Sequence, residues 1–282
     1  MSGRGWIKTA AVHMLLALTC AATLYPVLWV VKMAVSPLES LSLSANPFPQ
    51  HPTWRNFAAI VGAVDSSGRW LFGRNLLASL AVSTGTTVVG LFLAVTAAYA
   101  LSRFKFPGKQ AGLQALLISQ MFPATLMLIP IYAILQRLHL LNSLGGLVLV
   151  YSTTSLPFCV WMLKGYFDTI PRDLEEAAVM DGATHWQAFV LVVLPLSRPA
   201  LAVTALFSFM NAWNEFILAA TLLNDATIFT LPVALQRLVG EYKVEWGMFA
   251  AGALVVSAPV MALFFALQKH LVGGLTAGGV KG

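Results

Sequence analysis

Residues 174–195 read LEEAAVMDGATHWQAFVLVVLP, and they lie between two apolar segments that are each long enough to cross a bilayer. Acidic residues fill the first turn, where the positive end of the helix dipole favours negative charge. Gly182 permits the positive φ that ends a helix. Thr184 and Gln187 have the spacing of a capping box for a second helix, which Pro195 is expected to end. The stretch therefore predicts two short helices joined by a sharp turn.

Each short helix has a face of apolar or small residues that must be buried against something. Lying on lipid headgroups is one way, but helices that do so usually carry Lys and Arg on their polar face. This stretch is acidic and has no basic residue between Arg172 and Arg198, so an anionic inner leaflet disfavours it. Docking into a groove on a partner protein is the better interpretation.

The same residues carry a long, gapped pattern: Glu-Ala-Ala, three residues, Gly, nine residues, an aliphatic residue, one residue, Leu-Pro. Its members here are Glu176, Ala177, Ala178, Gly182, Val192, Leu194 and Pro195. The pattern resembles the EAA signature of permease subunits of ABC importers, which usually have Ile at the position of Val192. The fuller run, with residues 99–109 and 274–282, resembles the MalG-type permeases of maltose importers. The resemblance extends from about the second apolar segment to the C-terminus.

The composition is that of a polytopic helical membrane protein. The chain has 282 residues, of which 58% are hydrophobic and only 10% are charged, whereas a soluble domain has about 25% charged residues. The mean hydropathy is +0.78. The net charge of +6 comes from scattered basic residues that flank apolar segments, so it does not indicate nucleic-acid binding.

The sequence shows no motif for catalysis or metal binding. Cys20 and Cys159 both fall inside apolar stretches and are interpreted as small buried hydrophobic residues. The five histidines are isolated and match no zinc-protease spacing. Gly68 and Gly73 have the spacing of a phosphate loop but lack its Lys and its Ser or Thr. We therefore expect no catalytic residue, no metal and no cofactor in this chain.

Six apolar segments are long enough to cross the hydrocarbon layer, which needs roughly 20 helical residues. They are residues 11–35, 75–101, 112–135, 144–166, 199–221 and 246–268. The first is too long for the apolar part of a cleaved signal peptide and is interpreted as a retained membrane helix. The sequence thus predicts an all-α membrane protein with one transmembrane domain over residues 1–282, ending in a tail at 269–282.

The Lys and Arg residues favour a cytoplasmic position for both termini. With that orientation the short loop 102–111 lies inside and holds three basic residues, while the loop 136–143 lies outside and holds one. The same orientation places residues 167–198 in the cytoplasm. An ATPase would be found on that side, so charge and motif agree.

The fifth apolar segment holds the main cluster of polar residues within the membrane. These candidates for the translocation path are Ser208, Asn211, Asn214 and Glu215. Glu215 would lie roughly 9 Å from the outer end of the helix. A carboxylate at that depth is costly to place in lipid and is by default a candidate for the path. The alternative, a hydrogen bond between helices near the outer interface, stays open.

The resemblance implies the MetI-like fold of type I ABC importers, with cytoplasmic coupling helices and several partners. These partners would be a second, MalF-like permease, a homodimer of ATPase subunits that binds ATP and Mg²⁺, and an extracytoplasmic sugar-binding protein. The residues that would couple to the ATPase are Glu175, Glu176, Ala177, Ala178, Asp181, Gly182, Ala183, Leu194 and Pro195. Those of the tail that would enter the ATPase interface are Gly278, Gly279, Val280 and Lys281. Those that would face the binding protein are Gln236, Arg237, Glu241 and Tyr242.

The sequence thus favours a non-catalytic subunit of an ATP-driven sugar importer in the bacterial inner membrane. Maltose or maltodextrin is the preferred substrate, while trehalose and other oligosaccharides stay open. The second permease can be a distinct or an identical chain, and its binding protein can be soluble or lipid-anchored. The alternative function is an ion-coupled carrier with six helices. It would need carboxylates or unwound helices near the midplane, and only Glu215 is available.

Overall fold

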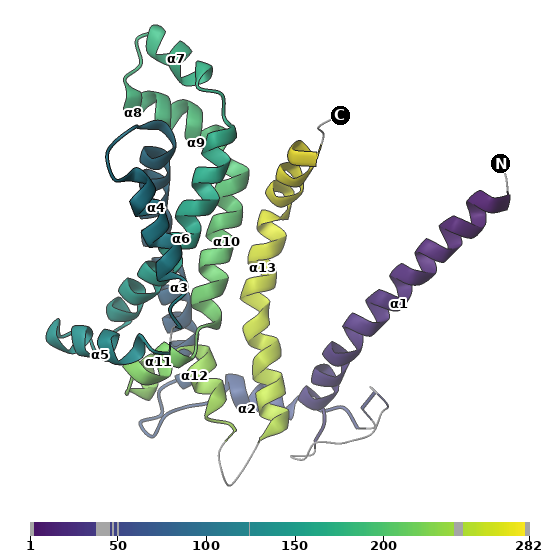
Figure 1. Ribbon diagram of the computed structural model, residues 1–282. Coiled ribbons are helices and arrows are strands. Elements are labelled where there is room, and N and C mark those ends of the chain that lie inside the picture. Colours follow the sequence, from purple (N-terminus) through teal and green to yellow (C-terminus); the bar gives the residue numbers. More distant parts are fainter. Residues whose placement is uncertain are drawn as a thin grey trace. The chain divides into compact units, whose positions relative to one another are not determined.

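The computed structural model describes residues 3–37, 46, 48–49, 51–123, 125–239 and 245–279, and it gives no side chains for 3–5, 7 and 269–279. Within these ranges the regular structure is helical, apart from one isolated bridge between Val64 and Trp70 (Figure 1). The chain divides into two compact units. The first unit contains residues 1–73 and 234–258, and the second unit contains residues 74–233 and 259–282.

Four helices in the described part of the chain are long and apolar enough to cross a membrane. They are α1 (Gly3–Ala34), α3 (Leu71–Arg103), α6 (Leu144–Thr169) and α13 (Trp246–Gly279). They coincide with the first, second, fourth and sixth apolar segments. The backbone of α13 stays helical through residues 269–279, where the sequence suggested a separate tail. The count of six spans and the orientation are consistent with this arrangement and stay predictions.

The other helices are shorter. They are α2 (Arg55–Val61), α4 (Lys109–Ser119), α5 (Leu128–Arg137), α7 (Asp173–Met180), α8 (His185–Ala188), η1 (Phe189–Val193), α9 (Leu194–Leu196), α10 (Arg198–Asn214), α11 (Ile217–Leu222), η2 (Ala226–Ile228) and α12 (Leu231–Gln236). The helix over 185–196 and α10 are apolar enough to form a span together, but they meet at an angle of 77°.

The predicted span at 112–135 is not one continuous helix. It consists of α4 and α5, and Pro123 lies in the break between them. Proline has no N–H to donate and disfavours helical conformation in the residue before it, which explains the break. The side-chain amide of Gln120 donates a hydrogen bond to the carbonyl of Thr154 in α6 (3.1 Å). The start of the break therefore lies beside the middle of α6.

The predicted span at 199–221 is also interrupted. α10 ends at Asn214, and Glu215 has an extended backbone with ψ of 130° before α11 begins. The Glu215 carboxylate accepts hydrogen bonds from the backbone N–H groups of Leu218 (2.9 Å) and Ala219 (3.1 Å). These are N–H groups that the first turn of a helix leaves without partners. The segment is thus a helix, a capped turn and a second short helix.

The core of the second unit forms around α6. Toward the start of α6, the buried Leu147 and Tyr151 pack with Leu218 and Leu222 of α11. Toward its end, the buried Leu163 and Phe167 pack with side chains of η1. The second of these clusters attaches the segment after α7 to the long helices, which positions the candidate site.

In the first unit, polar contacts join the end of α1 to α2 and to the start of α13. The Asn56 amide donates hydrogen bonds to the carbonyls of Ala34 (3.0 Å) and Ser36 (2.9 Å). Gly247 lies so close to Asn56 that a Cβ atom there would come within 2.6 Å of the amide nitrogen. In the following loop, the backbone N–H and the guanidinium of Arg69 hold the pKa of Asp65 below its ordinary value.

Candidate functional site

The elbow, defined here as residues 173–196, contains α7, α8, η1 and α9 and lies at one end of α6 and α10 (Figure 1). Its first helix ends in a left-handed turn. Gly182 has φ of 93°, its N–H donates to the carbonyl of Val179, and the N–H of Ala183 donates to the carbonyl of Ala178 (both 3.0 Å). This pair of bonds is a Schellman motif, which explains why the pattern needs glycine at this position.

The second helix of the elbow begins with the predicted capping box. The Gln187 N–H donates to the Thr184 hydroxyl (3.2 Å), and the Thr184 N–H donates to the Gln187 side-chain oxygen (2.8 Å). The helix over 185–196 ends at Leu196, one residue after the predicted end at Pro195. A π-helical stretch over Phe189–Val193 lies between α8 and α9, and such stretches are rare.

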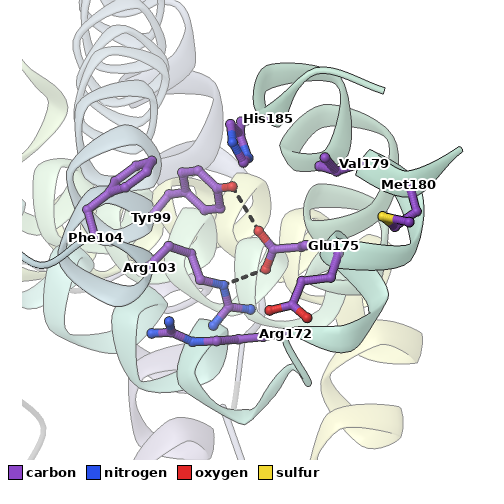
Figure 2. A pocket seen from close by; sticks show the side chains of 9 residues that line it. Tyr99, Arg103, Phe104, Arg172, Glu175, Val179, Met180 and His185 are labelled. Carbon is purple, nitrogen blue, oxygen red and sulfur yellow. Dashed lines mark hydrogen bonds and ion pairs between the residues drawn. The ribbon is translucent and has the colours of Figure 1, made fainter. Parts of the chain in front are cut away.

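Glu175 fastens the elbow to α3 (Figure 2). Its carboxylate accepts a hydrogen bond from the hydroxyl of Tyr99 (2.8 Å) and forms an ion pair with the guanidinium of Arg103. The side chains of Arg103 and Glu175 are 8% and 12% exposed, so the pair is largely shielded from water. The ring of Tyr99 also packs on that of Phe189, with 4.2 Å between centroids. Charge and packing together hold the elbow in place.

Further bonds tie the ends of α3 and α6 together at the base of the elbow. The Arg103 guanidinium donates to the carbonyl of Ile170 (3.0 Å), and the Ser102 hydroxyl donates to the Asp168 carboxylate (2.6 Å). Asp168 is also paired with Lys164. The elbow therefore packs on helix ends that hydrogen bonds and an ion pair hold together.

A cleft of about 420 Å³ opens between the end of α3 and the elbow (Figure 2). Its lining combines aromatic and apolar side chains with charges of both signs. The lining residues are Tyr99, Arg103, Phe104, Arg172, Glu175, Glu176, Val179, Met180 and His185. The cleft is open enough to receive a side chain from another protein.

The outward face of the elbow exposes apolar side chains. α7 has no buried residue, and the side chains of Met180 and Trp186 are 86% and 64% exposed. Glu176 and Ala177 are exposed on the same helix. An anchored element that exposes large apolar groups has the character of a protein-binding surface.

The predicted coupling residues are together in the elbow, but their environments differ. Glu175 is turned toward α3, whereas Glu176, Ala177, Asp181, Gly182 and Pro195 are exposed, and Ala178, Ala183 and Leu194 are half-buried. No local pattern in the sequence pairs Tyr99 and Arg103 with Glu175, because they are 76 and 72 residues away. The only signal for them was the resemblance carried by residues 99–109.

The four candidates for the translocation path lie in different environments. Ser208 is fully buried, and its hydroxyl has no partner in the described part of the chain. Asn211 is exposed, while the Asn214 amide donates to the carbonyl of Met210 (2.9 Å). Glu215 caps α11 and accepts a hydrogen bond from the hydroxyl of Tyr151 in α6. The hydrogen bond between helices that the sequence left open is therefore present.

The remaining predicted site residues lie at the edge of the described structure. Gln236 and Arg237 are exposed next to the end of α12. Gly278 and Gly279 are in the last turn of α13. Glu241, Tyr242, Val280 and Lys281 lie outside the described residues.

Solved structures with a similar fold are ABC transporters. One is a crystal structure of a bacterial ABC transporter involved in the import of the acidic polysaccharide alginate, with a TM-score of 0.78 at 22% identity over 95% of this chain and 98% of that chain. Another is the MetNI methionine ABC transporter in an inward-facing conformation, with a TM-score of 0.59 at 17% identity over 74% of this chain and 99% of that chain. The chain therefore shares its fold with chains of these ABC transporters.

Sequence relatives extend over almost the whole chain. It is 39% identical to the maltose/maltodextrin transport system permease protein MalG of Escherichia coli (strain K12), over 96% of this chain and 95% of that protein. It is 36% identical to the galactooligosaccharides transport system permease protein GanQ of Bacillus subtilis (strain 168), over 100% of this chain and 99% of that protein. Residues 86–276 match the family model of the binding-protein-dependent transport system inner membrane component. The chain belongs to this family and is a multi-pass protein of the bacterial inner membrane.

Proposed function

We propose that the chain is the permease subunit of an ATP-driven sugar importer, and that the elbow docks on a separate ATPase subunit. The proposal rests on one observation: α7 is exposed on its outer face and is held in place by contacts on its inner face. Its outward face has no buried residue, while its inward Glu175 is bound to Tyr99 and Arg103. A surface that is rigidly held and apolar suits the transmission of a force from one protein to another.

The coupling follows from the geometry. Closure of an ATPase dimer on ATP would push the elbow, and the ion pair to Arg103 would pass this displacement to α3. The bonds from Arg103 to Ile170 and from Ser102 to Asp168 would pass it on to α6. The permease would then switch between an inward-open and an outward-open state as a two-state element. ATP and Mg²⁺ would be bound by the ATPase, and no residue of this chain would do chemistry.

The substrate class and the partners rest on the relatives. MalG and GanQ are named as transport proteins for maltose or maltodextrin and for galactooligosaccharides. This supports an oligosaccharide, with maltose or maltodextrin as the first choice and trehalose as the next. A second permease and an extracytoplasmic sugar-binding protein would complete the importer. A solved alginate transporter in complex with a pentasaccharide-bound periplasmic protein has a related fold, with a TM-score of 0.68.

Charge reversal and steric block in the elbow test the docking. Glu176→Arg and Gly182→Trp are each expected to reduce copurification of the ATPase, and ATP-dependent uptake, by roughly tenfold or more, because central interface residues have effects of that size. Both positions are exposed, and nothing lies within 4 Å of a Cβ at Gly182, so neither new side chain clashes within the permease. The strain of a non-glycine residue at the positive φ of position 182 needs its own control.

Two matched controls separate docking from folding. Asp173→Arg makes the same charge change in the same helix at a position outside the predicted coupling set, and should couple nearly normally. Gly182→Asn keeps a residue that tolerates the left-handed conformation and adds little bulk. Normal uptake by Glu176→Arg and Gly182→Trp with their usual ATPase would contradict the docking proposal.

The ion-coupled carrier is not favoured by any contact in the described structure. The carboxylate of Glu215 is committed to capping α11 and to Tyr151. Proteoliposomes that contain the complete complex decide between the two functions. We expect uptake of radiolabelled maltose or trehalose to need internal ATP and to persist without proton or sodium gradients. Uptake that follows such a gradient without ATP would overturn the importer.

A further inference from the structure

A second groove, with a volume of about 320 Å³, opens halfway along α6. Pro157 contributes to its lining and lies roughly 18–20 Å from either end of this 26-residue helix, from the helical rise. The other walls come from α10 and from the end of α4. The groove is therefore at mid-depth in the predicted membrane, and it is distinct from the cleft at the elbow.

The groove combines apolar side chains with amide groups, which are costly on a surface that faces lipid. The Asn211 amide projects from α10, is exposed, and has no hydrogen-bond partner among the described residues. Gln120 also lines the groove and is the residue that caps α4, directly before the break. Non-helical backbone at membrane depth is tolerated only where it is covered by protein or lines an aqueous cavity. The break is therefore covered by protein or borders an aqueous cavity, and the exposed amide of Asn211 favours the aqueous cavity.

Aromatic rings form the other part of the wall. Phe207 stacks on Phe158 with 3.8 Å between ring centroids, which fixes its orientation, and it remains partly exposed. Trp161 is one turn further along α6 and is 37% exposed. A pyranose ring has a face of C–H groups and a rim of hydroxyls. Flat aromatic surfaces beside amide groups are complementary to the C–H face and to the hydroxyl rim. The volume of the groove is at the lower end of the range for small-molecule sites, roughly 300–1,000 Å³.

We propose that this groove is a subsite for one pyranose ring of the transported sugar. Trp161 and Phe207 contact the C–H face of the ring, and Asn211 and Gln120 bond its hydroxyls. The chain then contributes to sugar selectivity as well as to mechanical coupling. The inference rests on the proposed function, because it requires that a sugar crosses the membrane along this subunit.

Trp161→Ala tests the subsite in the complete importer, reconstituted with its second permease, ATPase and binding protein. The probe is radiolabelled maltose, or trehalose if maltose is not transported. We expect the sugar moved per ATP hydrolysed to fall by roughly tenfold, while hydrolysis stimulated by the binding protein is retained. Trp161→Phe, which keeps an aromatic face, should recover most of the loss. Met162→Ala is the control, because Met162 is the next residue, is also 37% exposed and lies outside the groove.

A pair of neighbouring threonines gives a second test that does not depend on a large truncation. Thr153 and Thr154 both donate their hydroxyls to the carbonyl three residues earlier, and only Thr154 lines the groove. Thr154→Val removes a groove hydroxyl whose oxygen can accept a hydrogen bond from the sugar, so it should lower uptake per ATP by a few-fold. Thr153→Val loses only the equivalent bond within α6 and should leave uptake unchanged. Equal effects of the two variants would overturn the subsite.

Thiol labelling shows what fills the groove. In a background with Cys20→Ala and Cys159→Ala, Asn211→Cys should react with a water-soluble thiol reagent in at least one nucleotide state, and maltose should slow the reaction. No labelling in any state would mean that protein or lipid fills the groove, and would overturn the subsite.

A wild-type complex without ATP-dependent uptake refutes the proposed function. Normal wild-type uptake with an equally active Trp161→Ala refutes the subsite alone.

Discussion

Glu175 and Glu215 each accept a hydrogen bond from a tyrosine of a long helix, but they have different second partners. Glu175 binds Tyr99 of α3 and is paired with the guanidinium of Arg103. Glu215 binds Tyr151 of α6 and otherwise accepts from two backbone N–H groups of α11. The first glutamate therefore joins two elements by charge, and the second completes the hydrogen bonds of a broken helix.

The difference suggests that the two glutamates have different functions. Glu175 connects the exposed elbow to the helices behind it, so its loss should disturb coupling more than folding. Glu215 lies against Tyr151, which is 1% exposed, so its loss leaves polar groups of the core without partners. Such unpaired buried groups are costly. An acidic residue in a membrane segment is thus not by itself a mark of the transport path.

The largest expected effect is that of Glu215→Ala on stability. The change removes the acceptor of three hydrogen bonds and leaves a buried Tyr151 hydroxyl unpaired. We expect a loss of about 4 kcal/mol, because bonds to a charged acceptor are stronger than neutral ones. This corresponds to a decrease of about 10 °C in the unfolding midpoint of the detergent-solubilised protein, measured by a thermal melt.

Glu215→Gln sharpens this test, because the amide oxygen can still accept a hydrogen bond. A small decrease in the midpoint with unchanged uptake would support the capping function. Altered uptake at unchanged stability would contradict it and assign Glu215 to the path. Asn214→Ala is the control for the neighbouring position, where the side chain bonds back to the carbonyl of Met210 in the same helix.

The regular parts of this fold follow from local patterns. The positive φ of Gly182 and the capping box at Thr184 depend on residues within a few positions of each other, and both predictions are confirmed. The four long helices follow from apolar length alone. The π-helical stretch at Phe189–Val193 has no comparable signal, because it depends on how the elbow packs against α3 and α6.

The breaks and the anchor could not be predicted because they depend on distant contacts. Pro123 was visible in the sequence, but membrane helices tolerate proline, so it could not decide between a bend and a break. The extended conformation at Glu215 depends on Tyr151, 64 residues away in the sequence. The pair between Arg103 and Glu175 spans 72 residues. From sequence alone, Glu175 and Glu176 look equivalent, and only the fold turns one inward.

The second prediction concerns Glu175→Ala. The ion pair is largely shielded, but Arg103 keeps its bond to the Ile170 carbonyl, so we expect a stability loss of about 2 kcal/mol. Uptake per ATP hydrolysed should fall more strongly, because the elbow then moves without α3. Proteoliposomes give both rates. The exchange Arg103→Glu with Glu175→Arg should recover part of the coupling. Tight coupling in Glu175→Ala would show that the elbow transmits motion by another route.

The smallest expected effects come from the two tyrosines, and they compare the two sites directly. Tyr99→Phe and Tyr151→Phe each remove one hydroxyl donor and keep the ring. The cost should be about 1 kcal/mol at the buried Tyr151 and smaller at the half-buried Tyr99, because Glu175 keeps its ion pair with Arg103. Tyr151→Phe should lower the thermal midpoint and leave uptake per ATP unchanged, because α11 stays capped by Glu215. Tyr99→Phe should lower uptake per ATP at nearly unchanged stability, because the elbow loses one of its two polar anchors on α3.

Tyr132→Phe is the control for both variants, because the Tyr132 hydroxyl has no hydrogen-bond partner within the described residues. It should change neither the midpoint nor the uptake per ATP. If Tyr99→Phe and Tyr151→Phe had the same effects on both quantities, the two glutamates would serve the same purpose. The difference between the ion pair of Glu175 and the helix cap of Glu215 would then have no consequence for transport. A lower midpoint in Tyr151→Phe and a lower uptake per ATP in Tyr99→Phe would instead show that folding and coupling depend on different ends of the same helix bundle.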